Sequence, residues 1–139
     1  MLDLDVSTSV LSVLIIEDQE DIATSLKMFL ELAAGHQVTV AMDGEAGIAA
    51  ALSHQPDAVV CDIGLPKKNG LEVAGVLNAM VRRPLLIACS AYSDDVMVAR
   101  GKTVGFDHFL CKPADPRKIL EILEDHHKTL DEARGETGL

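Results

Sequence analysis

The sequence predicts an α/β fold, a doubly wound three-layer sandwich with a parallel five-stranded sheet between helices. Two observations lead to this prediction. Short apolar runs, such as residues 13–16 and 85–89, recur along the chain, and a stretch with helical spacing of apolar residues follows each one. Continuous apolar runs are typical of strands buried on both faces. Strands that alternate with helices pair in parallel, and their crossovers place helices on both faces of the sheet.

The first two strand–helix units occupy the first third of the chain. A strand over about 13–17 precedes a helix over about 20–34, in which apolar residues recur every three or four positions and Gly35 provides the stop. A short alternating strand over 38–40 then precedes an Ala-rich helix over 44–52. The other three units repeat this alternation. They are predicted at 57–62 with 71–81, at 85–89 with 94–103, and at 109–111 with 116–133.

Length and composition indicate one acidic domain. The chain has 139 residues and a formal net charge of −10. It also has no cluster of basic residues of the kind that binds nucleic acid or anionic membranes. Its acidic start lacks the layout of a signal peptide, and no apolar run approaches membrane-spanning length. We therefore expect a cytoplasmic protein with a flexible leader at 1–11, a folded domain at 12–133 and a flexible tail at 134–139.

Three cysteines each precede a polar residue that ends an apolar run. They are Cys61, Cys89 and Cys111. Because side chains alternate across a strand, we expect the thiols to point away from those polar residues and into the core. A soft-metal or redox site built from the three thiols is the less favoured interpretation.

Polar residues with complementary chemistry close four of the predicted strands: Glu17 and Asp18, Asp62, Ser90, and Lys112. The carboxyl ends of parallel strands line one crevice, where ligands bind in open α/β sheets. Acids, a hydroxyl and an amine should therefore converge there. An ammonium and a hydroxyl both suit phosphoryl oxygens. The pattern predicts a site for a divalent cation and a phosphoryl group, with Asp62 as the best candidate to carry the phosphoryl.

The acids in this set suit a hard cation. Mg²⁺ prefers oxygen ligands, which Asp18, Asp62 and the carbonyl of Gly64 can supply directly, while Glu17 can act through a bound water. Clustered acids also repel one another, which should raise a pKa and favour cation uptake. Taken alone, Asp18 would be read as a helix cap or solvated acid. The alternative loses weight because suitable groups stand at four strand ends at once.

The chain resembles the receiver domain of response regulators in two-component signalling, and in particular the single-domain chemotaxis regulators. The resemblance covers about residues 12–130. It depends on Val-Leu-Ile-Ile-Glu-Asp at 13–18, Asp-Ile-Gly-Leu-Pro-Lys-Lys-Asn-Gly at 62–70, Cys-Ser-Ala at 89–91 and Gly-Phe-Asp-His-Phe-Leu-Cys-Lys-Pro at 105–113. It implies a flavodoxin-like (βα)5 fold with strand order 2-1-3-4-5.

The resemblance also implies a chemistry. Asp62 would accept a phosphoryl group from a histidine of a sensor histidine kinase or a histidine phosphotransfer protein. Asp18, Asp62 and the Gly64 carbonyl would hold Mg²⁺ or Mn²⁺, with Glu17 in the outer shell. Such a domain is a signalling module, not an enzyme in the usual sense, because it catalyses only its own phosphorylation and dephosphorylation.

Further residues acquire roles from the same resemblance. Ser90 and Lys112 would contact the phosphoryl group, and Ser90 and Phe109 would form the switch. Gly64 and Tyr92 occupy positions that influence the lifetime of the acyl phosphate. This chain departs from the commoner pattern by Glu17 for Asp, Ser90 for Thr and Phe109 for Tyr. The bond between Lys112 and the proline that follows it is commonly cis in the family.

Output is expected through protein contacts. The face formed by the fourth helix, the fifth strand and the last helix, with Tyr92, His108 and Phe109, would bind a downstream protein. The helix at 94–103 has an interior glycine, Gly101, which costs about 1 kcal/mol relative to Ala. We hypothesise that this helix is the mobile element of the switch.

Three alternatives differ in class. A haloacid-dehalogenase-type phosphatase would need a second acid two residues after Asp62, where the chain has Gly64. A flavodoxin-like electron carrier would need a phosphate-binding loop after the first strand, where the chain has an acidic segment at 17–21. A pseudo-receiver that only binds a partner is the third alternative and remains open. A separate open question is whether the chain is a receiver excised from a hybrid histidine kinase.

Overall fold

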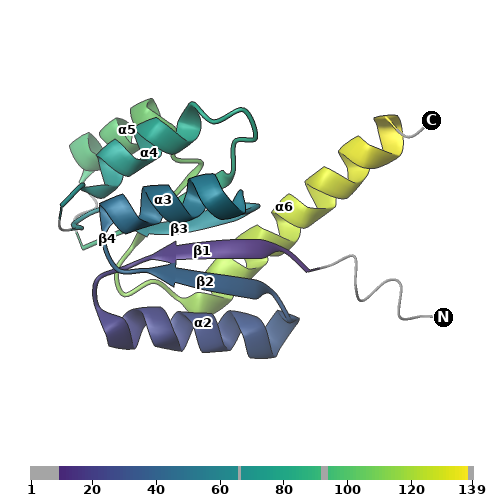
Figure 1. Ribbon diagram of the computed structural model, residues 1–139, viewed down its shortest axis with the longest axis horizontal. Helices are drawn as coiled ribbons and strands as arrows, with labels where there is room; N and C mark the ends of the chain where they lie inside the picture. The colour runs from purple at the N-terminus through teal and green to yellow at the C-terminus, as the bar shows by residue number, and fades with distance from the viewer. Residues whose placement is uncertain (1–9, 66, 92–93, 138–139) are drawn as a thin grey trace.

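The computed structural model describes residues 10–65, 67–91 and 94–137 of the chain. Within these residues five strands alternate with five helices (Figure 1). The strands are β1 (Ser12–Ile16), β2 (Gln37–Ala41), β3 (Ala58–Asp62), β4 (Leu85–Ser90) and β5 (His108–Cys111). The helices are α2 (Glu20–Ala34), α3 (Gly44–His54), α4 (Gly70–Asn78), α5 (Asp95–Val104) and α6 (Pro116–Thr137).

The strands form one parallel sheet in the order β2-β1-β3-β4-β5, which confirms the predicted fold class and strand order. Every residue of β3 is buried, and so are nearly all residues of β1 and β4. Their uninterrupted apolar runs reflect this burial, because helices cover both faces of the sheet. The edge strands β2 and β5 are more exposed.

Two apolar cores lie on opposite faces of the sheet. One core joins the sheet to α2 and α6 and contains Leu30 and Leu123, both fully buried. The other joins the sheet to α3, α4 and α5 and contains Leu77 and Phe106. Figure 1 shows α2 below the sheet and α3, α4 and α5 above it, while α6 starts near α2 and runs obliquely to the upper right. Because α6 shares its core with α2, the three layers are as predicted.

Several predicted helix ends agree with the observed caps. Asp94 caps α5 by accepting the backbone N–H of Met97 at 2.8 Å, and Asn69 forms a capping box with Glu72 at the start of α4. Gly35 ends α2 in the left-handed conformation that glycine tolerates, with φ of 70°.

Two helices end three or more residues away from the predicted position. Helix α4 ends at Asn78, three residues before the predicted end at 81, because the amides of Ala79 and Met80 bond carbonyls three residues back and tighten the chain into a turn. Helix α6 continues to Thr137, beyond the predicted end at 133.

The cysteine prediction is correct for two residues and wrong for the third. Cys61 is buried in the core under α3 and α4, and Cys89 is buried in the core under α2 and α6. Burial raises the pKa of both thiols, that of Cys89 to about 12. Cys111 is exposed, because β5 is an edge strand that the helices cover incompletely. The two buried thiols lie on opposite faces of the sheet.

Candidate functional site

The carboxyl ends of β1, β3, β4 and β5 meet at one edge of the sheet, and their parallel register sets how far each strand reaches. Asp62 at the end of β3 lies beside Cys89 of β4, and Ser90 lies beside Cys111 of β5. One residue further on, the backbone N–H of Lys112 donates to the carbonyl of Ser90 at 2.8 Å. The structure thus brings to one edge residues that are up to 95 positions apart in the sequence.

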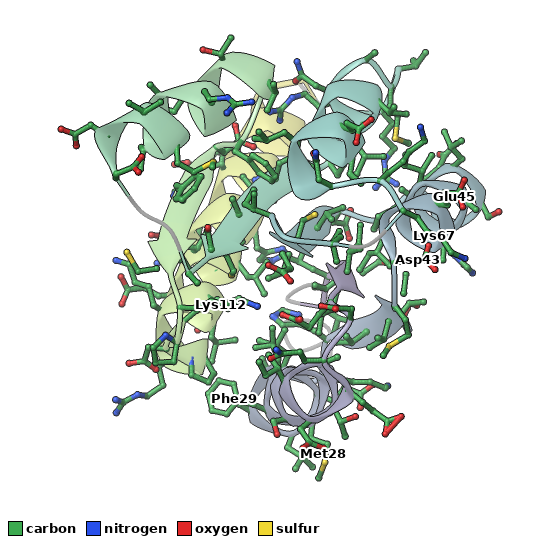
Figure 2. The ribbon with its side chains drawn as sticks, turned by 90° about the vertical axis from the view of Figure 1, so that its left-hand side faces the viewer. Met28, Phe29, Asp43, Glu45, Lys67 and Lys112 are labelled. Carbon is green, nitrogen blue, oxygen red and sulfur yellow. The ribbon has the colours of Figure 1, made fainter. Side chains whose placement is uncertain are left out.

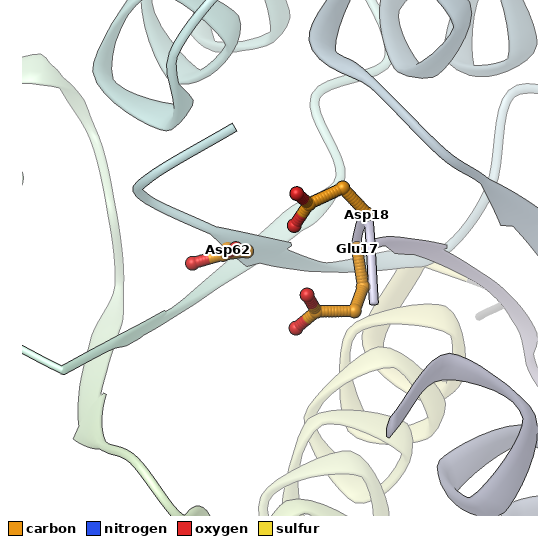
Figure 3. Close-up of side chains that lie close together, drawn as sticks. All are labelled: Glu17, Asp18 and Asp62. Atoms are coloured by element: carbon orange, nitrogen blue, oxygen red, sulfur yellow. The ribbon is translucent and has the colours of Figure 1, made fainter. Parts of the chain in front are cut away.

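Three carboxylates cluster at this edge. Glu17, Asp18 and Asp62 each offer an oxygen within 4.8 Å of the other two. Figure 3 shows the side chains of Glu17 and Asp18, just after β1, pointing toward the same space as Asp62. Glu17 and Asp62 are buried, with 4% and 8% of their surface exposed, while Asp18 is open to solvent. Two of the three carboxylates are therefore buried, and the third is accessible to solvent.

Lys112 is the cation that faces these acids. Its Nζ lies 2.9 Å from Oε1 of Glu17 and 3.4 Å from Oδ1 of Asp62. Figure 2 shows its side chain reaching inward from the end of β5. Burial alone would lower the pKa of Lys112, but the hydrogen bond that its ammonium donates to Glu17 and the charge of Asp62 outweigh burial and raise it. Lys112 therefore stays protonated next to the acids. The Lys112–Pro113 peptide bond is cis, as the resemblance implied.

Glu17 is held in place by two donors. Lys112 binds one of its carboxylate oxygens, and the backbone N–H of Gln19 donates to the other at 3.2 Å. Burial raises the pKa of Glu17, the charge of Asp62 adds to this effect, and the two hydrogen bonds oppose it.

The loop after β3 begins at the site. The backbone N–H of Gly64 donates to Oδ1 of Asp62 at 3.1 Å, so the Gly64 peptide lies beside the candidate phosphoacceptor. Gly64 is exposed, and a Cβ placed there would meet no atom within 4 Å. The space next to Gly64 is therefore open.

The remaining predicted residues lie at different depths. Ser90 is buried, with 2% of its surface exposed, at the end of β4. Phe109 is half-buried on β5 and packs on Gly101 of α5, where an added Cβ would lie 2.8 Å from two atoms of its ring. Gly101 is the buried residue of α5, and its lack of a side chain leaves room for the ring of Phe109. The same glycine also weakens the helix. Tyr92 lies outside the described residues.

A cleft beside the acids was missed by the sequence analysis. A space of about 600 Å³ opens next to Asp62 and Lys112, between α2 and the start of α6. Its walls are largely aliphatic and include Ile22, Leu26 and Ile119. The helical spacing of these residues predicts only a core-facing stripe, because the pattern does not reveal where two neighbouring helices separate.

The set of donors fits a hard divalent cation. The cluster offers carboxylate oxygens from three side chains, the ligand type that Mg²⁺ prefers, and one side of it is open to water. Three carboxylates face one ammonium, so the site keeps an excess of negative charge for a cation to neutralise. Among the described residues this is the group of acids, histidines or cysteines with the spacing of a metal site.

Residues 13–124 match the family model of the response regulator receiver domain. The chain is 32% identical over 107 residues to the alkaline phosphatase synthesis transcriptional regulatory protein PhoP of Bacillus subtilis, and this match covers 77% of the chain and 44% of that protein. It is 34% identical over 111 residues to the transcriptional regulatory protein KdpE of Mycobacterium tuberculosis, covering 80% of the chain and 48% of that protein. The chain thus spans less than half the length of these curated relatives.

Solved structures share this fold. The N-terminal domain of an uncharacterized protein from Wolinella succinogenes is 33% identical, with a TM-score of 0.79 over 88% of this chain and 98% of that one. A CheY-like receiver domain protein from Methanospirillum hungatei is 24% identical, with a TM-score of 0.81 over 88% of this chain and 97% of that one. The chain belongs to the receiver domain family of response regulators, which are signalling proteins of two-component systems.

None of the helices in the described segments is both long and apolar enough to cross a bilayer.

Proposed function

We propose that this receiver accepts a phosphoryl group on the carboxylate of Asp62 from a phosphohistidine of a sensor histidine kinase or a histidine phosphotransfer protein in the cytoplasm. A carboxylate oxygen of Asp62 forms a bond to phosphorus as the phosphorus–nitrogen bond of the donor breaks, and the imidazole leaves. The observation that supports this best is the cluster of Asp62 with Glu17 and Asp18, within reach of Lys112.

The chain's own groups would position the incoming phosphoryl. Phosphoryl transfer needs positioning and charge stabilisation more than covalent chemistry. Lys112 is already 3.4 Å from Asp62 and would move its ammonium to a phosphoryl oxygen. The hydroxyl of Ser90, buried at the next strand end, would donate a hydrogen bond to another.

Mg²⁺ or Mn²⁺ is the cofactor that we propose. Asp18, Asp62 and the carbonyl of Gly64 would hold the ion directly, and Glu17 would act from the outer shell. When bound, the ion would neutralise charge on the phosphoryl oxygens. The Lys112 bond to Glu17 supports the outer-shell role, because one oxygen of Glu17 already has a partner.

The output would be a change in a protein-binding surface. Ser90 and Phe109 are the proposed switch pair, and the surface would comprise α5, β5 and α6 with the exposed His108. Gly64 and Tyr92 are proposed to tune the lifetime of the acyl phosphate, which this domain would also hydrolyse itself. We keep 12–133 as the proposed receiver domain, either stand-alone or part of a larger regulator or hybrid kinase.

Incubation with acetyl phosphate and Mg²⁺, followed by intact mass measurement, tests the proposal. We expect wild type to gain the mass of one phosphoryl group, Asp62→Ala to gain none, and Lys112→Ala to be labelled more slowly. A parallel reaction uses a phosphorylated histidine phosphotransfer protein as the donor. If neither donor labels the wild-type chain, a pseudo-receiver that acts only by binding is the better description.

A further inference from the structure

The loop that leads from Asp62 to α4 is tightly packed at both of its ends, and both contacts involve glycines. At its start, a Cβ on Gly70 would lie 2.6 Å from the carbonyl oxygen of Asp62. Toward its end, a Cβ on Gly44 would lie 1.9 Å from the carbonyl oxygen of Lys68. Real Cβ atoms essentially never come within 3.0 Å of another heavy atom, so neither position accepts a side chain without movement of the backbone.

The contact at Gly44 is the informative one, because it comes from a separate element. Gly44 is the first residue of α3, the helix that precedes β3 in the sequence. A Cβ there would also lie 2.7 Å from the carbonyl carbon of Lys68, so the clash is with backbone atoms. No side-chain rotation could relieve it, and the loop would have to move by more than 1 Å merely to bring the 1.9 Å distance to the 3.0 Å limit.

Two further features tie the same helix turn to the same loop. Lys67 has a φ of 66°, a left-handed conformation that a non-glycine residue adopts only when its surroundings hold it there. Its ammonium lies 3.6 Å from Oδ2 of Asp43, the N-cap of α3, and Figure 2 shows the two side chains next to each other. Lys67 is largely exposed, so this ion pair is weak by itself and the backbone contact at Gly44 dominates.

We propose that the first turn of α3, with Gly44 at its contact point, positions the β3–α4 loop and thereby the Gly64 peptide beside Asp62. This inference rests on the proposed function, in which the Gly64 carbonyl is a ligand of the cation. Gly44 touches neither the acids nor the phosphoryl group, so it is a positioning residue. Displacing a ligand-bearing backbone by about 1 Å is enough to impair binding and group transfer severely.

The inference can be separated from a purely structural role of Gly44. Any clash in the fold would lower the free energy of unfolding, but only displacement of the ligand loop would weaken the cation in protein that is still folded. The chain offers two matched substitutions. Gly47→Ala, in the same helix, would press on the side chain of Ile16 in the core, and Gly75→Ala would enter open space in α4.

The experiment is titration of Mg²⁺ by calorimetry, with the rate of labelling by acetyl phosphate as the second measurement. Circular dichroism first verifies that each full-length variant is folded. We expect Gly44→Ala to bind Mg²⁺ roughly tenfold more weakly than wild type and to be labelled more slowly, as for loss of a supporting residue around a metal. Gly47→Ala should be less stable than wild type but bind Mg²⁺ with the same affinity. Gly75→Ala should match wild type in both stability and Mg²⁺ affinity.

The outcomes are distinct. If wild type neither binds Mg²⁺ nor is labelled, the proposed function fails and this inference fails with it. If wild type does both and folded Gly44→Ala matches it, only the inference fails. Should Gly44→Ala not fold, Asp43→Ala decides, because it removes the N-cap bond to the Ala46 amide and so loosens the first turn of α3, which carries Gly44. An unchanged Mg²⁺ affinity in folded Asp43→Ala would then overturn the proposal.

Discussion

Acidic residues stand at both edges of the sheet, but the two edges use them differently. At the amino edge, Asp57 accepts the backbone N–H of Ser12 at 2.8 Å and pairs with Arg82 at 2.7 Å. Asp107 accepts the backbone N–H of Leu86 at 2.8 Å and pairs with Arg83. Each of these acids thus connects its own strand to a neighbouring one. At the carboxyl edge the acids face one another instead.

This difference shows how position along a strand determines the role of an acid. An acid that precedes a strand lies near the free N–H group at the start of the neighbouring strand in the sheet. The hydrogen bond between them satisfies both partners. An acid after a strand meets the other strand ends, which in this chain also carry acids. Like charges at close range destabilise the ionised forms of neighbouring carboxylates. The acids at the carboxyl edge can therefore still gain from binding a cation, whereas those at the amino edge already have backbone and arginine partners.

The largest expected effect comes from removing one charge at the carboxyl edge. Asp18→Asn should weaken Mg²⁺ binding roughly a hundredfold, more than loss of a supporting residue would, because it removes a direct ligand. Without Mg²⁺ its free energy of unfolding should equal or exceed that of wild type, since one repulsion is gone. Calorimetry and urea unfolding measure the two quantities. An unchanged Mg²⁺ affinity would show that Asp18 is not a ligand.

The matching change at the amino edge should lower the free energy of unfolding and leave the Mg²⁺ affinity unchanged. Asp57→Ala leaves the Ser12 N–H without its acceptor, and we expect the free energy of unfolding to fall by about 2 kcal/mol. The Arg82 pair adds little, because that side chain is 55% exposed. Mg²⁺ affinity should not change. Glu121→Ala, on the exposed face of α6, is the control and should affect neither quantity. A loss of Mg²⁺ affinity in Asp57→Ala would contradict the division between the edges.

The smallest effect is a pH dependence at the amino edge. His36 is buried, and its Nδ1 accepts the backbone N–H of Leu11 at 3.1 Å, so the ring is neutral in the fold. Burial lowers its pKa from 6.5, against a smaller opposing effect of Glu124. The unfolded chain therefore binds the proton more readily. The stability that His36 contributes is complete above pH 6.5 and is lost as the pH falls through the lowered pKa.

Urea unfolding between pH 7.5 and 5.5 measures this dependence. His36→Gln keeps an acceptor for Leu11 and should flatten the slope. A slope should remain, because burial also lowers the pKa of His126. His54→Gln, at an exposed position on α3, serves as the control and should leave the slope unchanged. The assignment to His36 would be wrong if the two variants gave the same slope.

The sequence predicted the fold and the strand-end residues because both depend on short-range patterns. Apolar runs and helical spacing are set by the geometry of each element, and they led to the correct strand order once the family resemblance was added. The same patterns could not show that Cys111 is exposed. Its run looks like that of a central strand, and only the position of β5 at the edge of the sheet leaves it uncovered.

The order of residues is enough to specify which chemical groups stand at the strand ends: the acids at 17, 18 and 62, the hydroxyl at 90 and the ammonium at 112. The burial of Glu17 against Lys112 and the contact of α3 with the β3–α4 loop at Gly44 become visible only in the folded chain. The two kinds of information differ in the separation along the chain over which they arise. Periodicity records how one element meets its surroundings, whereas contacts between residues such as Glu17 and Lys112 exist only after the elements have packed.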